Sequence, residues 1–291
     1  MSIYEYKQHR SKFWLKIYDD NDYVNIITTE VIKNIINSAF PLLEDIGPKG
    51  WCPTKYSPEN YSLWIPRDRV DDDQIEALKN WSENANLHIW LGVNHNTESY
   101  FQGEELDYCV ATDWNRLFGD SGNRTVVGEA EYQLKYPYAR GEISEEQKDA
   151  YVSTLCKAII DTIALLPIRG RNLLVCTIPA TREEQHKLSW AIAHFVCNSL
   201  QAEFLNVALL RSKPKTKELS VNEKIEVWRK IYTENAVDLS SPVAGKNVII
   251  VDDLYQSGAS IWTYAEYLKN LGARKVIGVV AVKSQRDSDN K

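Results

Sequence analysis

The chain has 291 residues, of which 44% are hydrophobic and 25% are charged, and its formal net charge at pH 7 is −6. These values are ordinary for a folded globular protein, so they exclude disorder over most of the length. The negative charge argues against a general nucleic-acid or membrane-surface binder, because such proteins carry a basic excess. No apolar run approaches the ~20 residues that span a bilayer, and we expect a cytoplasmic protein without a membrane partner.

Residues 1–140 hold most of the aromatic side chains and consist of short apolar pieces separated by turn signals. Apolar residues near one helical face predict a helix over residues 24–43, and a second helix is expected after the acidic run at residues 71–73. Residues 87–93 have the pattern of a buried strand. We therefore predict an aromatic-rich α+β accessory region, or hood, over residues 1–140.

Residues 141–291 alternate helix and strand patterns, which predicts an α/β domain with a parallel sheet. Capping boxes begin at Ser144, Thr181 and Ser220 and predict the helices that follow them. A further helix is predicted over residues 257–271. Strands are predicted over residues 173–179, 204–210, 248–251 and 276–282.

One run in this domain carries the chemistry: residues 248–260 read Val-Ile-Ile-Val-Asp-Asp-Leu-Tyr-Gln-Ser-Gly-Ala-Ser. A buried strand ends at two carboxylates, and a small-residue loop then leads into a helix. Ligands of open parallel sheets bind outside the carboxyl ends of the strands, and a helix N-terminus is a ready phosphate site. Asp252 and Asp253 would repel a phosphate, so we expect them to hold ribose hydroxyls or a metal carried by the ligand.

This run resembles the phosphoribosyl pyrophosphate (PRPP) signature of type I phosphoribosyltransferases, which has four apolar residues, two acids, a short loop with Thr-Gly, and a Thr. The resemblance implies that Asp252 and Asp253 bind the ribose hydroxyls of PRPP. It also implies that the following loop wraps the 5′-phosphate, through Leu254, Tyr255, Gln256, Ser257, Gly258, Ala259 and Ser260. Serines replace the usual threonines and keep the hydroxyls, whereas Gln256 departs from the pattern.

Two further segments fit the same family, and the resemblance covers residues 143–285. Ala180, Thr181 and Arg182 fall where the family places its pyrophosphate-binding loop. The basic segment 211–219 falls where the family has its mobile flap. This segment adds Arg211 as a PRPP-binding candidate, and Lys213 and Lys215 join the two aspartates as catalytic candidates; Lys217 is a further cation there. Residues 211–229 look most like the ComF-type branch.

The resemblance implies a phosphoribosyltransferase fold over residues 141–291 and transfer of the phosphoribosyl group from PRPP to a nitrogenous acceptor, with release of pyrophosphate. It implies Mg²⁺ as the cofactor, held mainly by the ligand rather than by protein side chains. Two other functions stay open. One is a regulator that senses PRPP or a nucleotide without turnover, and the other is a module whose aromatic N-terminal half binds a protein partner or a second copy of the chain.

The simpler explanations also stay open for each segment. Asp252 and Asp253 are also consistent with a solvated strand end beside a helix cap. Residues 179–182 are consistent with an ordinary turn from strand to helix. The cations of residues 211–217 are consistent with an exposed basic loop.

Overall fold

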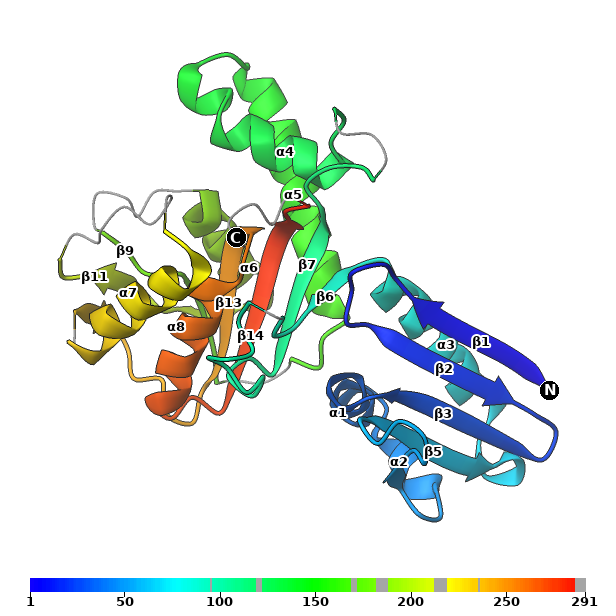
Figure 1. The fold of residues 1–291 in the computed structure, drawn as a ribbon. Helices are drawn as coiled ribbons and strands as arrows, with labels where there is room; N and C mark the ends of the chain where they lie inside the picture. The colour runs from blue at the N-terminus through cyan, green and yellow to red at the C-terminus, as the bar shows by residue number, and fades with distance from the viewer. Residues whose placement is uncertain are drawn as a thin grey trace. The chain divides into compact units, whose positions relative to one another are not determined.

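The structure is a computed structural model that describes residues 1–94, 96–118, 122–168, 172–181, 188–211, 219–234 and 236–285. The chain forms two compact units (Figure 1). The first is Met1–Trp90 with Ala164–Ile168, and the second is Leu91–Ile163 with Arg169–Lys291. None of the helices in the described part of the chain is both long and apolar enough to cross a bilayer.

The first unit is built on a five-stranded antiparallel sheet in the order β1-β2-β3-β5-β4. Its strands are β1 (Ser2–Lys7), β2 (Trp14–Asp19), β3 (Tyr23–Thr29), β4 (Trp51–Pro53) and β5 (Asn60–Pro66). Its helices are α1 (Glu30–Ala39), α2 (Pro41–Ile46) and α3 (Asp72–Asn86), with a short 3-10 turn at Arg67–Arg69. The helix predicted after residues 71–73 is α3, which is confirmed.

The helix predicted over residues 24–43 is wrong in its first part. Residues 24–29 belong to β3, in which Val24, Ile26 and Thr28 are buried and alternate with less buried neighbours. This period of two is the mark of a strand, and β-branched side chains favour it. The helical period begins only at Glu30, where Ile32, Ile35 and Ile36 share one buried face. The two patterns follow each other without a turn, so they look like one long apolar helix.

The second unit is built on a six-stranded sheet in the order β10-β8-β13-β14-β7-β6, in which the short edge strand β6 includes the last residues of the Met1–Trp90 segment of the first unit. The pairings from β10 to β7 are all parallel, which confirms the predicted α/β sheet. The strands are β6 (Ile89–Leu91), β7 (Tyr108–Trp114), β8 (Leu173–Thr177), β10 (Glu203–Phe204), β13 (Asn247–Tyr255) and β14 (Lys275–Lys283). A smaller sheet has the order β12-β11-β9, from Val237–Leu239, Val207–Leu209 and Ala180–Thr181.

The strand β7 changes the division of the chain. It lies before residue 140, in the region expected to be an accessory hood, yet it pairs with β14 along most of its length. The two compact units consequently divide after Trp90, whereas the sequence analysis placed the boundary at residue 140. The break at residues 138–142 is instead a 3-10 turn, Tyr138–Arg140, between the helices α4 (Val126–Lys135) and α5 (Glu145–Ala164).

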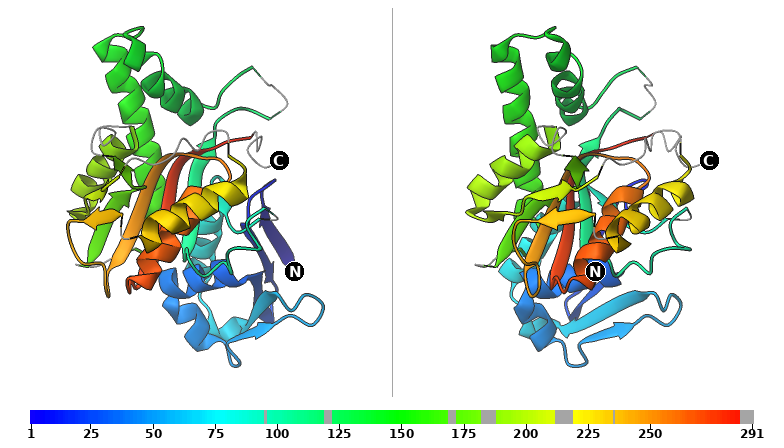
Figure 2. Two further views of the ribbon diagram at one scale, coloured as in Figure 1. Left: turned by 60° about the vertical axis from the view of Figure 1, so that its left-hand side comes forward. Right: turned by 90° about the vertical axis from the view of Figure 1, so that its left-hand side faces the viewer.

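The remaining helices of the second unit are α6 (Leu188–Leu200), α7 (Val221–Thr233) and α8 (Ala259–Asn270). Helix α6 packs on β8 and β13, α8 packs on β14, and α7 packs on α8. In the right-hand view of Figure 2, α6 and α8 lie on opposite faces of the sheet. After β8 the chain continues to β10, which lies on the side of β8 away from β13. After β13 it continues to β14, which lies on the side of β13 away from β8. The sheet therefore has its switch point between β8 and β13, where a crevice forms at the carboxyl ends.

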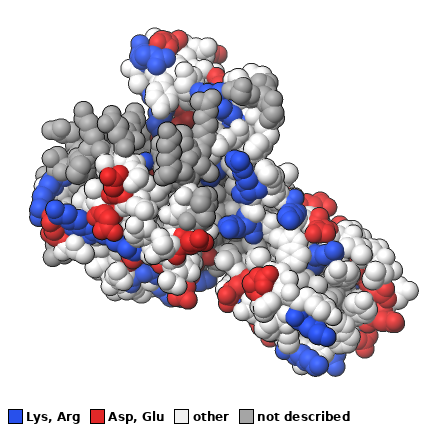
Figure 3. Space-filling view, viewed as in Figure 1, with Lys and Arg blue, Asp and Glu red and all other residues white. Residues whose placement is uncertain are grey.

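Acidic and basic side chains are mixed over the visible surface of each unit (Figure 3). The apolar interior of the second unit is centred on β13 and β14, whose residues from Val248 to Val251 and from Val276 to Val282 are almost fully buried. Strands covered on both faces carry such continuous apolar runs. The sheet core thus fixes the point at which polar side chains first appear at the end of β13.

Candidate functional site

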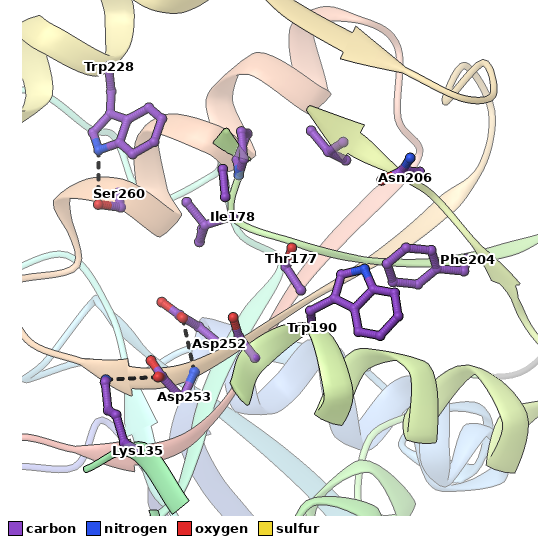
Figure 4. Close-up of a pocket in the computed structure, with 14 residues that line it drawn as sticks. Lys135, Thr177, Ile178, Trp190, Phe204, Asn206, Trp228, Asp252, Asp253 and Ser260 are labelled. Atoms are coloured by element: carbon purple, nitrogen blue, oxygen red, sulfur yellow. Dashed lines mark hydrogen bonds and ion pairs between the residues drawn. The ribbon is translucent and has the colours of Figure 1, made fainter. Parts of the chain in front are cut away.

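A cavity of about 300 Å³ lies at the switch point of the six-stranded sheet (Figure 4). Asp252 and Asp253 line it from the end of β13, and Thr177 and Ile178 line it from the end of β8. Strand β13 is longer than the predicted 248–251, because pairing with β14 continues through Asp252 and on to Tyr255. The acid pair therefore sits on rigid backbone at the carboxyl edge, where ligands of such sheets bind.

The other walls of the cavity are partly aromatic and partly polar. Trp190 of α6 and Phe204 of β10 lie beside each other on one side, and Trp228 of α7 lies on another (Figure 4). The polar wall residues include Ser189 and Asn206. Pro179 and Ala180, which follow β8, also line the cavity. The cavity is thus lined by charged, hydrogen-bonding and aromatic side chains, as small-molecule sites commonly are.

A lysine from α4 reaches the acid pair. The Lys135 ammonium lies 2.8 Å from Asp253 Oδ2 (Figure 4). It also lies 3.3 Å from Glu131 Oε1. Burial opposes the charge on Lys135, but the carboxylates of Asp253 and Glu131 outweigh it and raise the pKa of Lys135. Burial also raises the pKa of Glu131, and Lys135 acts in the opposite direction. The lysine therefore stays charged between two acids.

Asp252 is the more perturbed member of the acid pair. Burial, and then repulsion from Asp253, raise the pKa of Asp252 well above the usual range of an aspartate. The charge of Lys135 and the backbone N–H of Asp253, which donates to Asp252 Oδ1 at 2.9 Å, act in the opposite direction. Two carboxylates at adjacent positions cannot both ionise as easily as one alone. The pair is thus poised to gain a further cation or hydrogen-bond donors from a ligand.

The predicted phosphate loop is a tight turn that ends at Gly258. This glycine has a φ of +84° and precedes the first residue of α8. Ser257 and Tyr255 are buried, and the indole N–H of Trp262 donates to the Tyr255 hydroxyl at 3.0 Å. Ser260 accepts a hydrogen bond from the indole N–H of Trp228 at 3.0 Å. The turn therefore delivers Ser260, in the first turn of α8, to the cavity.

The structure brings together part of the predicted site. Asp252, Asp253, Ser260 and Ala180 all line the cavity. Other predicted residues do not line it, namely Leu254, Tyr255, Gln256, Ser257, Gly258 and Ala259. Their proposed contact with a phosphate remains a prediction.

The basic residues of the prediction lie mostly outside the described residues. Lys213, Lys215 and Arg182 fall in segments that the structure does not describe, and of Thr181 only the backbone in β9 is described. Arg211 is described and exposed. Its guanidinium pairs with the Glu234 carboxylate at 2.8 Å and is absent from the cavity wall.

Sequence reasoning missed several cavity residues. Asn206 had a usable signal, because it follows β10 near the carboxyl edge of the sheet. Trp190 and Trp228 looked like ordinary core residues of their helices. Lys135 had no signal, because its contact depends on α4 packing on β7 and β14, and strand order is not visible in the sequence.

Part of the chain is similar to known proteins. Residues 192–291 match the family model of the phosphoribosyl transferase domain. Among solved structures, the chain is similar to a hypoxanthine phosphoribosyltransferase from Staphylococcus aureus, with 16% identity and a TM-score of 0.34 over 48% of this chain and 68% of that one. It is also similar to a hypoxanthine-guanine phosphoribosyltransferase from Bacillus anthracis, with 17% identity and a TM-score of 0.34 over 51% of this chain and 75% of that one. No curated protein matches.

Residues 192–291 are therefore a phosphoribosyl transferase domain. The parallel sheet is that of the type I phosphoribosyltransferase fold, as the sequence predicted. The ComF-type branch stays a prediction.

Proposed function

We propose that this protein binds PRPP in the cavity at the end of β13 and transfers its phosphoribosyl group to a nitrogenous acceptor, releasing pyrophosphate. The observation that supports this best is the meeting of three segments around one cavity. These are the acid pair Asp252 and Asp253, the backbone at Ala180, and Ser260 in the first turn of α8. They match the three parts of PRPP, which are the ribose hydroxyls, the pyrophosphate and the 5′-phosphate.

Each part of the ligand has a physical reason for its place. Carboxylates accept hydrogen bonds from cis hydroxyls, which suits Asp252 and Asp253 to the ribose. The first N–H groups of α8 have no partner within the helix and carry the positive end of the helix dipole, which suits them to a phosphate. The leaving pyrophosphate would lie along residues 178–180, and the basic segment 211–219 would neutralise its charge. Catalysis would rest on positioning and charge stabilisation.

The residues of this site fit a magnesium ion carried by the ligand. Mg²⁺ is usually held by one or two carboxylates together with phosphates and water, and Asp252 and Asp253 offer carboxylate oxygens in the cavity. Among the described residues, no group of three or more acidic, histidine or cysteine side chains could hold a metal by itself. When bound, the ion would offset the charge of the pyrophosphate. The acceptor remains unidentified, and the cytoplasmic location remains a prediction.

The direct test is calorimetric titration of the full chain with PRPP and Mg²⁺. We expect binding by the parent protein and a loss of about ten- to a hundredfold in affinity for Asp252→Asn and for Asp253→Asn, since a hydrogen bond to a charged group contributes ~1.5–3 kcal/mol. Asp161→Asn is the matched control, because this acid is exposed on α5 and pairs only with Lys157 among the ion pairs of the described residues. Unchanged binding by the double variant of the acid pair would overturn the proposal.

Turnover needs a second assay, because a sensor would bind PRPP equally well. Pyrophosphate release should be measured over a panel of nitrogenous bases. Changing Lys213, Lys215 and Lys217 together to Ala should reduce pyrophosphate release far more than PRPP affinity, because only interactions that strengthen in the transition state raise turnover. Tight PRPP binding without release for any acceptor would indicate a sensor instead of an enzyme.

A further inference from the structure

We propose that Lys135 of α4 is the counter-ion that lets an anionic ligand approach the acid pair, and that it holds Asp253 in position. This inference rests on the proposed function. Lys135 lies well before residue 192, where the match to the phosphoribosyl transferase domain begins. It contacts Asp253 at 2.8 Å and lines the cavity itself. It is thus a positioning residue supplied to the domain by an earlier part of the chain.

The position of Lys135 is fixed through the start of α4. Thr125 caps the helix by accepting a hydrogen bond from the Gly128 N–H at 3.0 Å. The Thr125 hydroxyl also donates to the Trp114 carbonyl oxygen at the end of β7, at 2.5 Å. Gly128 lies so close to the Asn115 backbone that a Cβ there would meet the Asn115 carbonyl carbon at 2.7 Å. Helix α4 is therefore held against the carboxyl end of β7.

The same helix orients the lysine side chain. Glu131 is one turn before Lys135, and its carboxylate lies 3.3 Å from the ammonium. The Glu131 side chain is only 5% exposed, so its choice of partners is narrow. A residue and its neighbour four positions later share one helix face, which directs the lysine along α4 toward the cavity. The Lys135 ammonium consequently forms ion pairs with both Glu131 and Asp253.

The need for a cation follows from the charge of the site. Asp252, Asp253 and Glu131 place three acids near the position proposed for a strongly anionic ligand. Opposite charges separated by a few ångströms interact strongly where water is partly excluded. Lys135 offsets the charge of the Asp253 carboxylate, whose oxygens can also accept hydrogen bonds from a ligand. Without the lysine, the three acids would repel the phosphate groups of the ligand.

Among the described residues, few titratable groups other than Lys135 and Glu131 act on Asp252 and Asp253. Cys109 of β7 interacts with Asp252, but burial raises the pKa of its thiol, which keeps it protonated and neutral. Arg124 acts on Glu131 and pairs with Glu129 at 3.6 Å. Lys135 is therefore the cation in direct contact with the pair among the described residues.

The test compares PRPP binding, with Mg²⁺, by the full-length parent and three variants at neutral pH. Lys135→Met should weaken binding by about ten- to a hundredfold. Lys135→Arg should keep most of the affinity. Lys157→Met removes the same charge from an exposed pair on α5 and should change nothing.

A fourth variant keeps the inference testable if Lys135→Met does not fold. Glu131→Gln removes the charge of the carboxylate that orients the lysine, so PRPP should bind more weakly than in the parent, though less weakly than in Lys135→Met. Parent-like affinity for a folded Glu131→Gln, or for Lys135→Met, would overturn the role of Lys135 while leaving the proposed function intact. A parent protein that fails to bind PRPP would overturn both.

Discussion

The Tyr255 hydroxyl occupies the space beside Gly258 that a Cβ on residue 258 would fill. The Tyr255 ring carbon that bears the hydroxyl would lie 2.6 Å from such a Cβ, and Trp262 Cδ1 would lie 2.9 Å from it. The resemblance in sequence placed this glycine in a loop that wraps a phosphate. The structure gives a reason for the glycine itself, which is that the turn folds over its own aromatic side chains. The φ of +84° adds a second requirement for glycine.

Gly258→Ala should therefore destabilise the protein even in the absence of a ligand. The left-handed backbone costs a residue with a Cβ roughly 1–2 kcal/mol, and the contact with Tyr255 adds to this cost. Gly245→Ala is the matched control, because Gly245 has a φ of +71° but nothing within 4 Å of a Cβ. Urea unfolding should show a larger loss for Gly258→Ala. Equal losses would mean that Tyr255 does not fill the space.

A second glycine tests the attachment of α4. Gly128→Ala should push α4 away from the Asn115 backbone and cost roughly 1–3 kcal/mol, as overpacking does. Because Lys135 is on the same helix, PRPP affinity should also fall. Val126→Ala is the control, since Val126 is 76% exposed on α4 and should change stability by no more than about 0.5 kcal/mol. Parent-like PRPP affinity in Gly128→Ala would show that the placement of α4 does not matter to the site.

The raised pKa of Asp252 makes a prediction about stability and pH. The folded state holds the Asp252 proton to a higher pH than the unfolded state does. The protonated Asp252 therefore stabilises the folded state. This stabilisation is fully present below about pH 4, the ordinary pKa of an aspartate, and it is lost as the pH rises through the raised pKa of Asp252. The melting temperature of Asp252→Asn should therefore fall less between pH 5 and 8 than that of the parent.

The asparagine variant keeps an oxygen that can accept from the Asp253 N–H, so the comparison isolates the charge of residue 252. Glu131 has a pKa raised in the same direction, but it is present in both proteins and cancels in the difference. Asp161→Asn, on the exposed surface of α5, should follow the parent curve. If Asp252→Asn follows it too, Asp252 is not buried in the way described. If Asp252→Asn is more stable than the parent but binds PRPP more weakly, residue 252 shows the trade-off between stability and function that is common at functional sites.

The position of the acid pair could be predicted from sequence, because a buried apolar run must end where polar side chains begin, and this fixes the carboxyl edge of a parallel strand. The helix start at Ser220 could be predicted for a similar reason, since its capping box with Glu223 is local chemistry. Lys135 could not be predicted. Its contact with Asp253 requires β14 to lie between β13 and β7, and that order depends on pairings between strands far apart in the chain.

The boundary at residue 140 illustrates the same limit. Strand β7 follows an irregular stretch and has no helix–strand rhythm before it, so its sequence resembles the accessory region. Only its pairing with β14 assigns it to the six-stranded sheet. The break at residues 138–142 was a real turn, but it joins two helices of one unit rather than two units. The local sequence therefore located the turn correctly. Whether the turn separates two helices or two units depends on the pairing between distant strands.

The pair formed by Arg211 and Glu234 leads to the last prediction. Their ion pair is 2.8 Å long but exposed, and exposed pairs contribute only about 0–1 kcal/mol. If Arg211 binds PRPP as predicted, it must leave Glu234, and Glu234→Gln removes that competitor. We expect Glu234→Gln to tighten PRPP binding about two- to fivefold, and Arg211→Ala to weaken it. Lys230→Met is the control, since it removes the other cation near Glu234, at 4.0 Å, and leaves the Arg211 pair in place. Parent-like titration curves for both Glu234→Gln and Arg211→Ala would mean that Arg211 belongs to the surface alone.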